Sequence, residues 1–154
     1  MTWRVAKSLL KLRETVNGKF PARKKDWDGT IGDEAHASRA SDHNPWVREG
    51  TTGVVTAMDI THDPAHGVDS YKLAEQLRIG RDPRIKYVIS NRRICSSEVS
   101  PWTWRPYKGK NPHDHHVHVS VHSDKIHYDD EAPWEIPMLG KVPTSAPEKS
   151  GKEN

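Results

Sequence analysis

Residues 116–122 read HVHVSVH, and this strict alternation of valine with polar residues constrains the fold more than any other stretch. Side chains along a β-strand point to opposite faces in turn, so the pattern predicts a half-buried strand. The three valines are expected to face a core. The opposite face would carry His116, His118, Ser120 and His122. Residues two apart on one face are separated by roughly 6.5–7 Å, from which imidazoles can converge on a metal ion.

The length of the chain fits one domain. Its 154 residues can bury a real core, although only 33% are hydrophobic and the mean hydropathy is -0.89. Six tryptophans supply bulky side chains for burial, so we expect a folded, loop-rich protein with a modest core. We expect residues 1–139 to form this domain. Residues 140–154, which are polar and contain several prolines, serines and lysines, are expected to be a flexible tail.

Cysteine usage and hydropathy bear on where the chain is made. Its single cysteine, Cys95, excludes an internal disulfide, which fits synthesis in a reducing cytoplasm; a small buried residue is expected there. No apolar signal region and no run of eighteen apolar residues is present. We therefore expect no signal peptide and no membrane span, so that another factor must release the protein if it acts outside the cytoplasm. We also expect a monomer.

The charge balance suits an anionic partner. The net charge is +3, and residues 1–25 hold eight Lys or Arg against one acid, Glu14. Nucleic acid or an anionic cell wall would match such a surface, and so would a plain solvated helix face. Charge alone does not decide between them.

Hydrophobic spacing and turn residues predict the remaining elements. They are a helix from Thr2 to about Val16, a loop over 18–52, a strand over 53–61, a helix from Asp69 to Gly80, a hairpin of 85–90 with 92–96, a loop over 101–112 and a segment that packs Trp134 on the domain. This order favours a small α+β domain with a central antiparallel sheet flanked by two or more helices.

A metal site is the most specific functional expectation. Zinc takes about four ligands, and a catalytic zinc leaves one position for water. Asp59 lies inside an apolar strand, where a carboxylate is costly unless it is paired with an arginine or binds a metal. His43 lies in the polar loop SDHNP and taken alone fits an ordinary loop histidine. Several histidines on one strand face, with His113 just before, are rarely left to a core.

The segments SDHNP, GVVTAMDI and NPHDHHVHVSV together resemble the zinc peptidases that cut bacterial cell-wall peptides. These are the D-Ala-D-Ala carboxypeptidase and endopeptidase group, related to lysostaphin-type enzymes and the hedgehog zinc domain. The chain is most similar to phage endolysin peptidases with SDHNP, DITHDPAHG and HVHVS segments, over roughly residues 20–135. The resemblance implies one zinc per chain and peptidoglycan as partner. It also implies action on the wall during host lysis or from a virion, without nucleic-acid or membrane partners.

The resemblance also implies residue roles. The family's zinc ligands fall on His43, Asp59 and His118. The first histidine of the His-x-His pair, which lies beside the metal-bound water, is His116, and the further histidine of some members is His113. Two departures stand out. The carboxypeptidase branch has a glutamate base three residues before the last histidine, where this chain has His115, and residues 45–52 look like an inserted loop.

In the expected mechanism, zinc polarises a water that attacks a peptide carbonyl. We expect His116 to accept the water proton and pass it to the leaving amine. Asp114 is the second candidate, either as base or as a partner that orients a histidine, and His113 could donate to the oxyanion. Arg39 and Arg105 could pair with carboxylates of the substrate, or serve a structural purpose.

Two other function classes stay open. A metal-dependent nuclease with histidine and asparagine motifs would place its last histidine on a helix, whereas a strand pattern carries it here. A zinc-binding module without activity would use the same ligands, although His113 and His116 beside them argue against it. The bond that a peptidase would cut is also open among L-Ala-D-Glu, the cross-link and the D-Ala ends.

Overall fold

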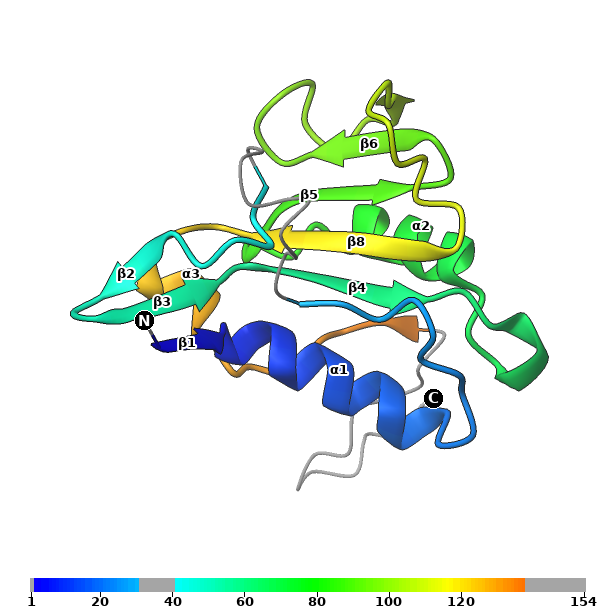
Figure 1. Ribbon diagram of the computed structural model, residues 1–154. Coiled ribbons are helices and arrows are strands. Elements are labelled where there is room, and N and C mark those ends of the chain that lie inside the picture. Colours follow the sequence, from blue (N-terminus) through cyan, green and yellow to red (C-terminus); the bar gives the residue numbers. More distant parts are fainter. Residues whose placement is uncertain (1, 31–40, 138–154) are drawn as a thin grey trace, which may run out of the picture.

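The computed structural model describes residues 2–30 and 41–137. These residues form two sheets and three α-helices, which confirms a small α+β domain with helices flanking a largely antiparallel sheet (Figure 1). The elements in chain order are β1 (Thr2–Val5), α1 (Lys7–Lys19), β2 (Val47–Glu49), β3 (Thr52–Val55), β4 (Ala57–Thr61), η2 (Pro64–His66), α2 (Ser70–Gly80), β5 (Ile85–Ser90), β6 (Arg93–Ser96), β7 (Arg105–Pro106), β8 (His116–Val121) and α3 (Lys125–Tyr128).

The larger sheet has the strand order β4-β8-β5-β6-β7, and every neighbouring pair is antiparallel. The expected histidine strand is therefore β8, held between β4 and β5 (Figure 1). One row of paired residues crosses the whole sheet: Asp59, His118, Ile89, Ile94 and Arg105. Directly paired residues share a face of a sheet, so this row lies on one face.

The smaller sheet, formed by β1, β3 and β2, differs from what the sequence predicted. The expected helix from Thr2 is wrong at its start, because Thr2–Val5 pairs in parallel with β3 and the helix begins at Lys7. The run 53–61 is also two strands, interrupted at Thr56, whose N–H donates to the carbonyl of Asp42 at 3.3 Å. The apparent inserted loop supplies β2, which pairs antiparallel with β3.

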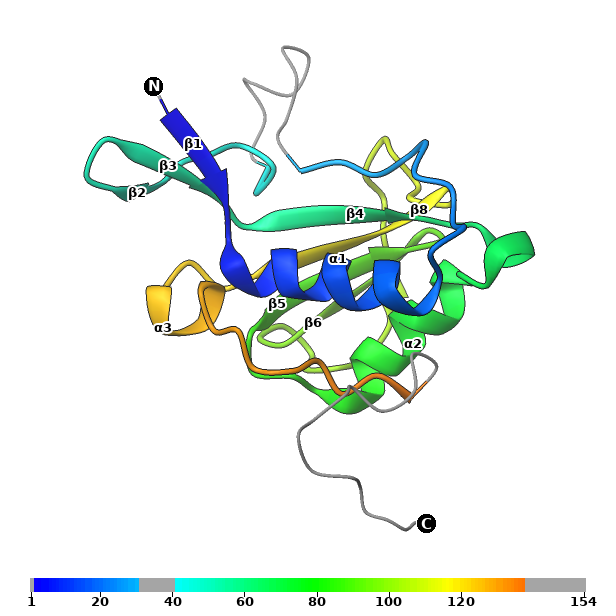
Figure 2. The same cartoon turned by 90° about the horizontal axis from the view of Figure 1, so that it is seen from below.

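The main core lies between the sheet and the helices. Figure 2 shows α1 running beside β4. The helix α2 and the segment that follows α3 lie on the same side of the larger sheet as α1. The valines of β8 are buried there as expected, and Asp69 caps α2 by accepting hydrogen bonds from the N–H groups of Tyr71 and Lys72. The helix side chains buried in this core are Leu9, Leu12, Val16, Leu73, Ala74 and Leu77. Within the described ranges, no helix is long and apolar enough to cross a bilayer.

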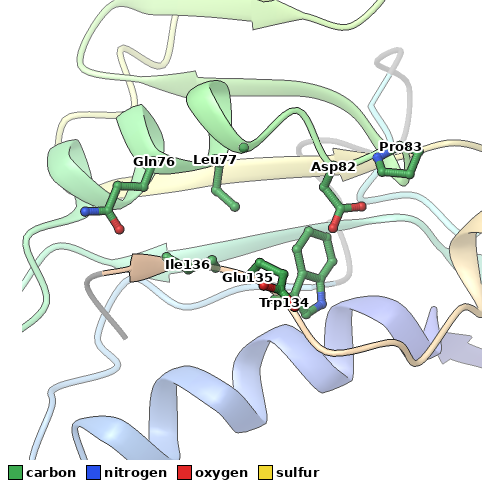
Figure 3. Close-up of a pocket in the computed structure, with 8 residues that line it drawn as sticks. Gln76, Leu77, Asp82, Pro83, Trp134, Glu135 and Ile136 are labelled. Carbon is green, nitrogen blue, oxygen red and sulfur yellow. The ribbon is translucent and has the colours of Figure 1, made fainter. Parts of the chain in front are cut away.

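Trp134 packs back on the domain, as its sequence position predicts. Its indole N–H donates to the carbonyl of Ser8 at 2.9 Å, and the guanidinium of Arg84 lies 3.9 Å from the ring centroid. Beside it, Leu77 and Pro83 line a pocket of about 200 Å³ (Figure 3). None of the residues that line this pocket is a histidine, so it is separate from the expected site.

Cys95 is a buried free cysteine in β6, which confirms its expected place. Two other expectations fall outside the described residues: the tail over 140–154 and the substrate-binding position Arg39.

Candidate metal centre

Three side chains converge at the middle of β4 and β8. His43 Nε2 lies 3.2 Å from Asp59 Oδ1 and 3.1 Å from His118 Nδ1, and His118 Nδ1 lies 3.3 Å from Asp59 Oδ1. Nitrogen and oxygen ligands about 2.0–2.1 Å from a tetrahedral zinc lie about 3.3–3.4 Å apart. The triangle therefore has the size that a divalent cation needs. It unites the three residues expected as ligands, and they form a group that could hold a metal ion.

Hydrogen bonding shows which nitrogen of His43 is free. Its Nδ1 lies 2.7 Å from the carbonyl oxygen of Thr30, which can only accept, so Nδ1 carries the proton. Nε2 of the neutral ring is then a lone pair that faces the Asp59 carboxylate. Two acceptors at this distance repel unless a positive species lies with them. The chemistry of the donor set therefore fits a bound cation or, without one, an extra proton.

The charges of the site also favour a bound cation or an extra proton. Burial disfavours the charged form of His43, but the Asp59 carboxylate outweighs this and raises the pKa of His43. Burial would likewise raise the pKa of Asp59, yet the adjacent imidazoles of His118 and His43 outweigh burial and hold it well below its usual range. Asp59 is thus a buried, ionised carboxylate surrounded by imidazoles. Among the described residues, no arginine forms an ion pair with it, although such a pair was the alternative reading of its sequence position.

Two further histidines lie against this triangle. His116 Nε2 is 3.5 Å from Asp59 Oδ2, and the rings of His113 and His116 are 4.9 Å apart between centroids. Burial lowers the pKa of His113 to about 3 and also lowers the pKa of His116. Both rings are therefore neutral at pH 7. His113 has a left-handed backbone with φ of 55°, and its N–H donates to the side-chain oxygen of Asn111 at 3.0 Å.

The segment before residue 30 places the Thr30 carbonyl. The guanidinium of Arg23 donates to both oxygens of Asp28, at 3.0 and 2.7 Å. Asp28 in turn accepts from the N–H and hydroxyl of Thr61, at the end of β4. Gly29 then pairs with Asp59 through two backbone hydrogen bonds. These contacts hold residues 28–30 along the free edge of β4, next to the triangle.

Contacts with β5 and β3 hold the loop that carries His43 in place. The carboxylate of Asp42 is buried and lies 3.2 Å from the ammonium of Lys86 on β5. Pro45 packs directly on Gly53 of β3, where a side-chain Cβ would collide with the proline carbonyl. The motif SDHNP therefore fixes the loop to both sheets and directs His43 toward β4.

Other aromatic and hydroxyl groups support the histidines. Ser120 Oγ lies 2.8 Å from Nε2 of His118, and the ring of Tyr87 stacks on His118 with 5.4 Å between centroids. At the rim, the indole of Trp27 stacks on the exposed ring of His115 at 4.7 Å. The sequence placed Ser120 on the histidine face but gave it no role. Tyr87, Trp27 and the Thr30 carbonyl were missed.

The remaining expected site residues lie outside the triangle. The carboxylate of Asp114 is 3.6 Å from Nε2 of His115, and its backbone carbonyl accepts from the hydroxyl of Tyr71. Its expected role as base or orienting partner stays a prediction. His122 lies beyond the end of β8, with its ring beside that of His127.

Arg105 shares the sheet face of the ligands but stands three strands away from His118, about 14 Å at the usual strand spacing. Its Nε is buried and has no hydrogen-bond partner in the described part of the chain. Its expected role in binding a substrate carboxylate also stays a prediction.

Comparison of the chain with models of known protein families, with curated proteins and with solved structures finds no match.

Proposed function

We propose that this protein is a zinc-dependent peptidase that hydrolyses a peptide bond of bacterial peptidoglycan. One observation carries the proposal: a cation-sized triangle of His43, Asp59 and His118 lies directly beside two buried, neutral histidines. Zinc held by these three residues would lower the pKa of a water molecule and polarise the substrate carbonyl. Two imidazoles and one carboxylate form a ligand set used by catalytic zinc sites.

His116 is the proposed proton carrier. Its ring nitrogens have no hydrogen-bond partner in the described ranges, so a lone pair is available to accept a proton from the attacking water. The imidazolium that forms would lie 3.5 Å from the Asp59 carboxylate, which favours the charged state. The same proton can then pass to the leaving amine. His113, whose ring lies 4.9 Å from that of His116 between centroids, would donate a hydrogen bond to the carbonyl oxygen as it gains charge.

The choice of peptidoglycan rests on chemistry around the centre and on the resemblance of the motifs. Peptidoglycan stem peptides carry free carboxylates, and Arg105 offers a guanidinium on the same sheet face, about 14 Å from His118. The net charge of +3 favours approach to an anionic wall. Exposed Trp27 at the rim can pack on a sugar or a peptide.

The two rival classes find less support. A nuclease of the histidine and asparagine type needs a helix that brings its final histidine to the metal. In the described residues, the clustered groups come from β4, β8 and loops instead. An inactive metal-binding module would not explain why ring nitrogens of His113 and His116 are buried without hydrogen-bond partners in the described residues, since such burial is energetically costly.

The decisive experiment is digestion of purified peptidoglycan by the full chain loaded with one zinc per molecule, followed by mass spectrometry of the fragments. We expect new peptide termini at one type of bond, which identifies the bond at the same time. Asp59→Ala serves as the metal-free control, and plasmid DNA as the control substrate. Intact peptidoglycan, or cleavage of DNA instead, would refute the proposal.

A further inference from the structure

The Asp59 carboxylate faces two groups of histidines. Its Oδ1 belongs to the triangle with His43 and His118, whereas its Oδ2 points to His116 Nε2 at 3.5 Å. Asp59, His113 and His116 each offer a ligand atom, and these atoms all lie within 4.8 Å of one another. The second group therefore repeats the composition of the first: two imidazoles and one oxygen of the same carboxylate.

The two outer histidines are buried, and three of their ring nitrogens have no hydrogen-bond partner in the described part of the chain. His113 is 7% exposed and His116 is 6% exposed. Nδ1 of His113 and both ring nitrogens of His116 are buried without a hydrogen-bond partner among residues 2–30 and 41–137. Buried polar atoms are nearly always satisfied, and each one left unpaired destabilises the fold. A neutral imidazole ring carries one lone pair, and a cation held between the two rings and Asp59 would satisfy these lone pairs.

We propose that His113, His116 and the second carboxylate oxygen of Asp59 bind a second divalent cation, zinc, beside the first, and that this second ion inhibits hydrolysis. Binding takes the lone pair of His116, so this residue can no longer accept a proton. The binding site stands on its own geometry, whereas the inhibition rests on the proposed function. Excess zinc would thus limit the activity of the protein.

The second site is the weaker of the two. In the first group, His43 donates to the Thr30 carbonyl and His118 contacts the Ser120 hydroxyl, so both ligands are oriented by a second hydrogen bond. The ring of His116 has no such partner in the described chain. Loss of outer partners typically reduces metal affinity by 10–100-fold. Repulsion from a cation in the first group lowers the affinity further.

The test is a zinc titration of the full chain, stripped of metal with a chelator and followed by isothermal calorimetry at pH 7.5. We expect two sites per chain, the second weaker by at least about 10-fold. His113→Ala and His116→Ala should each keep the tight site and lose the weak one, and a retained tight site also shows that the variant is folded. His127→Ala, which removes a histidine of α3, should keep both sites.

One zinc per wild-type chain, or a weak site that survives in both variants, would overturn the second site. Cleavage of peptidoglycan should be greatest at one zinc per chain and fall as the weak site fills. Cleavage that stays constant or rises during that filling would overturn the inhibition. Two binding steps with no cleavage at any zinc concentration would instead refute the proposed peptidase function, while the second site would stand.

Discussion

At the scale of single residues, the metal centre depends on which imidazole nitrogen carries a proton. His118 can bind a cation through Nδ1 only if its proton is on Nε2, where Ser120 Oγ lies at 2.8 Å and can accept it. The other tautomer would direct an N–H at the metal position. Under the proposed zinc binding, Ser120 would orient His118 and select its metal-binding form, as outer partners of metal-bound histidines do in general.

Ser120→Ala removes this acceptor and leaves the fold intact, because the change only shortens a small buried side chain. Zinc affinity should fall by about 10–100-fold, measured by competition with a chelator of known affinity. The matched control is Ser8→Ala, which alters another buried serine, on α1, whose hydroxyl has no hydrogen-bond partner in the described part of the chain. Equal zinc affinity in the two variants would show that Ser120 has no part in orienting His118.

The convergence of His43, Asp59 and His118 was expected because the motifs that carry them resemble those of cell-wall zinc peptidases, and the structure brings the three side chains together. The sequence could not predict the contact with Thr30, since a backbone carbonyl leaves no trace in residue identity. Tyr87 was equally hidden, because its place on His118 depends on the register between β5 and β8, which includes an irregularity between Ile85 and Tyr87.

At the scale of elements, the alternation of β8 predicted a strand but not its surroundings. All six residues of β8 are buried, not only the valines, because the segment over 28–30, the His43 loop and Tyr87 cover the histidine face. The strand Thr2–Val5 was missed because Val5, Leu9 and Val16 fit one helical face. Its pairing with β3 is a tertiary contact, and tertiary contacts override local propensity.

The segment over 28–30 is held by a buried ion pair, so Asp28→Asn should destabilise the domain. The side chain of Arg23 is fully buried, and loss of the charge of its partner should cost about 3 kcal/mol in urea unfolding with chelator present. Zinc affinity should fall too, because the Thr30 carbonyl loses its support. The control Glu14→Gln alters an acid that is 77% exposed, and its effect should stay within about 0.5 kcal/mol.

The destabilisation by Asp28→Asn has a defined pH dependence. Burial would raise the pKa of Asp28, but hydrogen bonds from Arg23 and Thr61 outweigh this and lower it below the ordinary value of 3.8. A carboxyl with a lowered folded-state pKa stabilises the fold above its unfolded pKa and loses this contribution as the pH falls through the folded pKa. The stability difference between wild type and variant should therefore be constant from pH 7 to about 5 and shrink below 3.8. A difference that grows in acid would contradict this origin.

At the scale of the whole molecule, the segment after α3 holds distant parts of the chain together. Trp134 is almost fully buried and connects two distant parts of the chain, the Ser8 carbonyl on α1 and the guanidinium of Arg84 before β5. The sequence predicted this packing, since a lone tryptophan among acidic residues and prolines is most stable when buried. The sequence could not predict that Trp134 packs on α1, because α1 is more than one hundred residues away in the chain.

Trp134→Ala should cost about 3–5 kcal/mol, as truncation of a buried tryptophan does, and lower the melting temperature by roughly 10 °C. Differential scanning calorimetry measures both. Deletion of residues 140–154 is the comparison: their polar composition predicts a change of less than about 2 °C. A small effect of Trp134→Ala would show that Trp134 does not stabilise the domain as expected. A large effect of the deletion would show that residues 140–154 contribute to its stability.

The most direct test of the proposed chemistry compares His116→Ala with Asp59→Ala, with zinc content and peptidoglycan peptide cleavage measured on the same preparations. If His43, Asp59 and His118 hold the catalytic zinc and His116 carries the proton, His116→Ala keeps one tightly bound zinc per chain. Its kcat should fall by roughly 10²–10⁴ with little change in KM. Asp59→Ala should lose zinc and cleavage together. Loss of the tight zinc in His116→Ala, or full zinc with wild-type cleavage, would contradict the division between ligands and proton carrier.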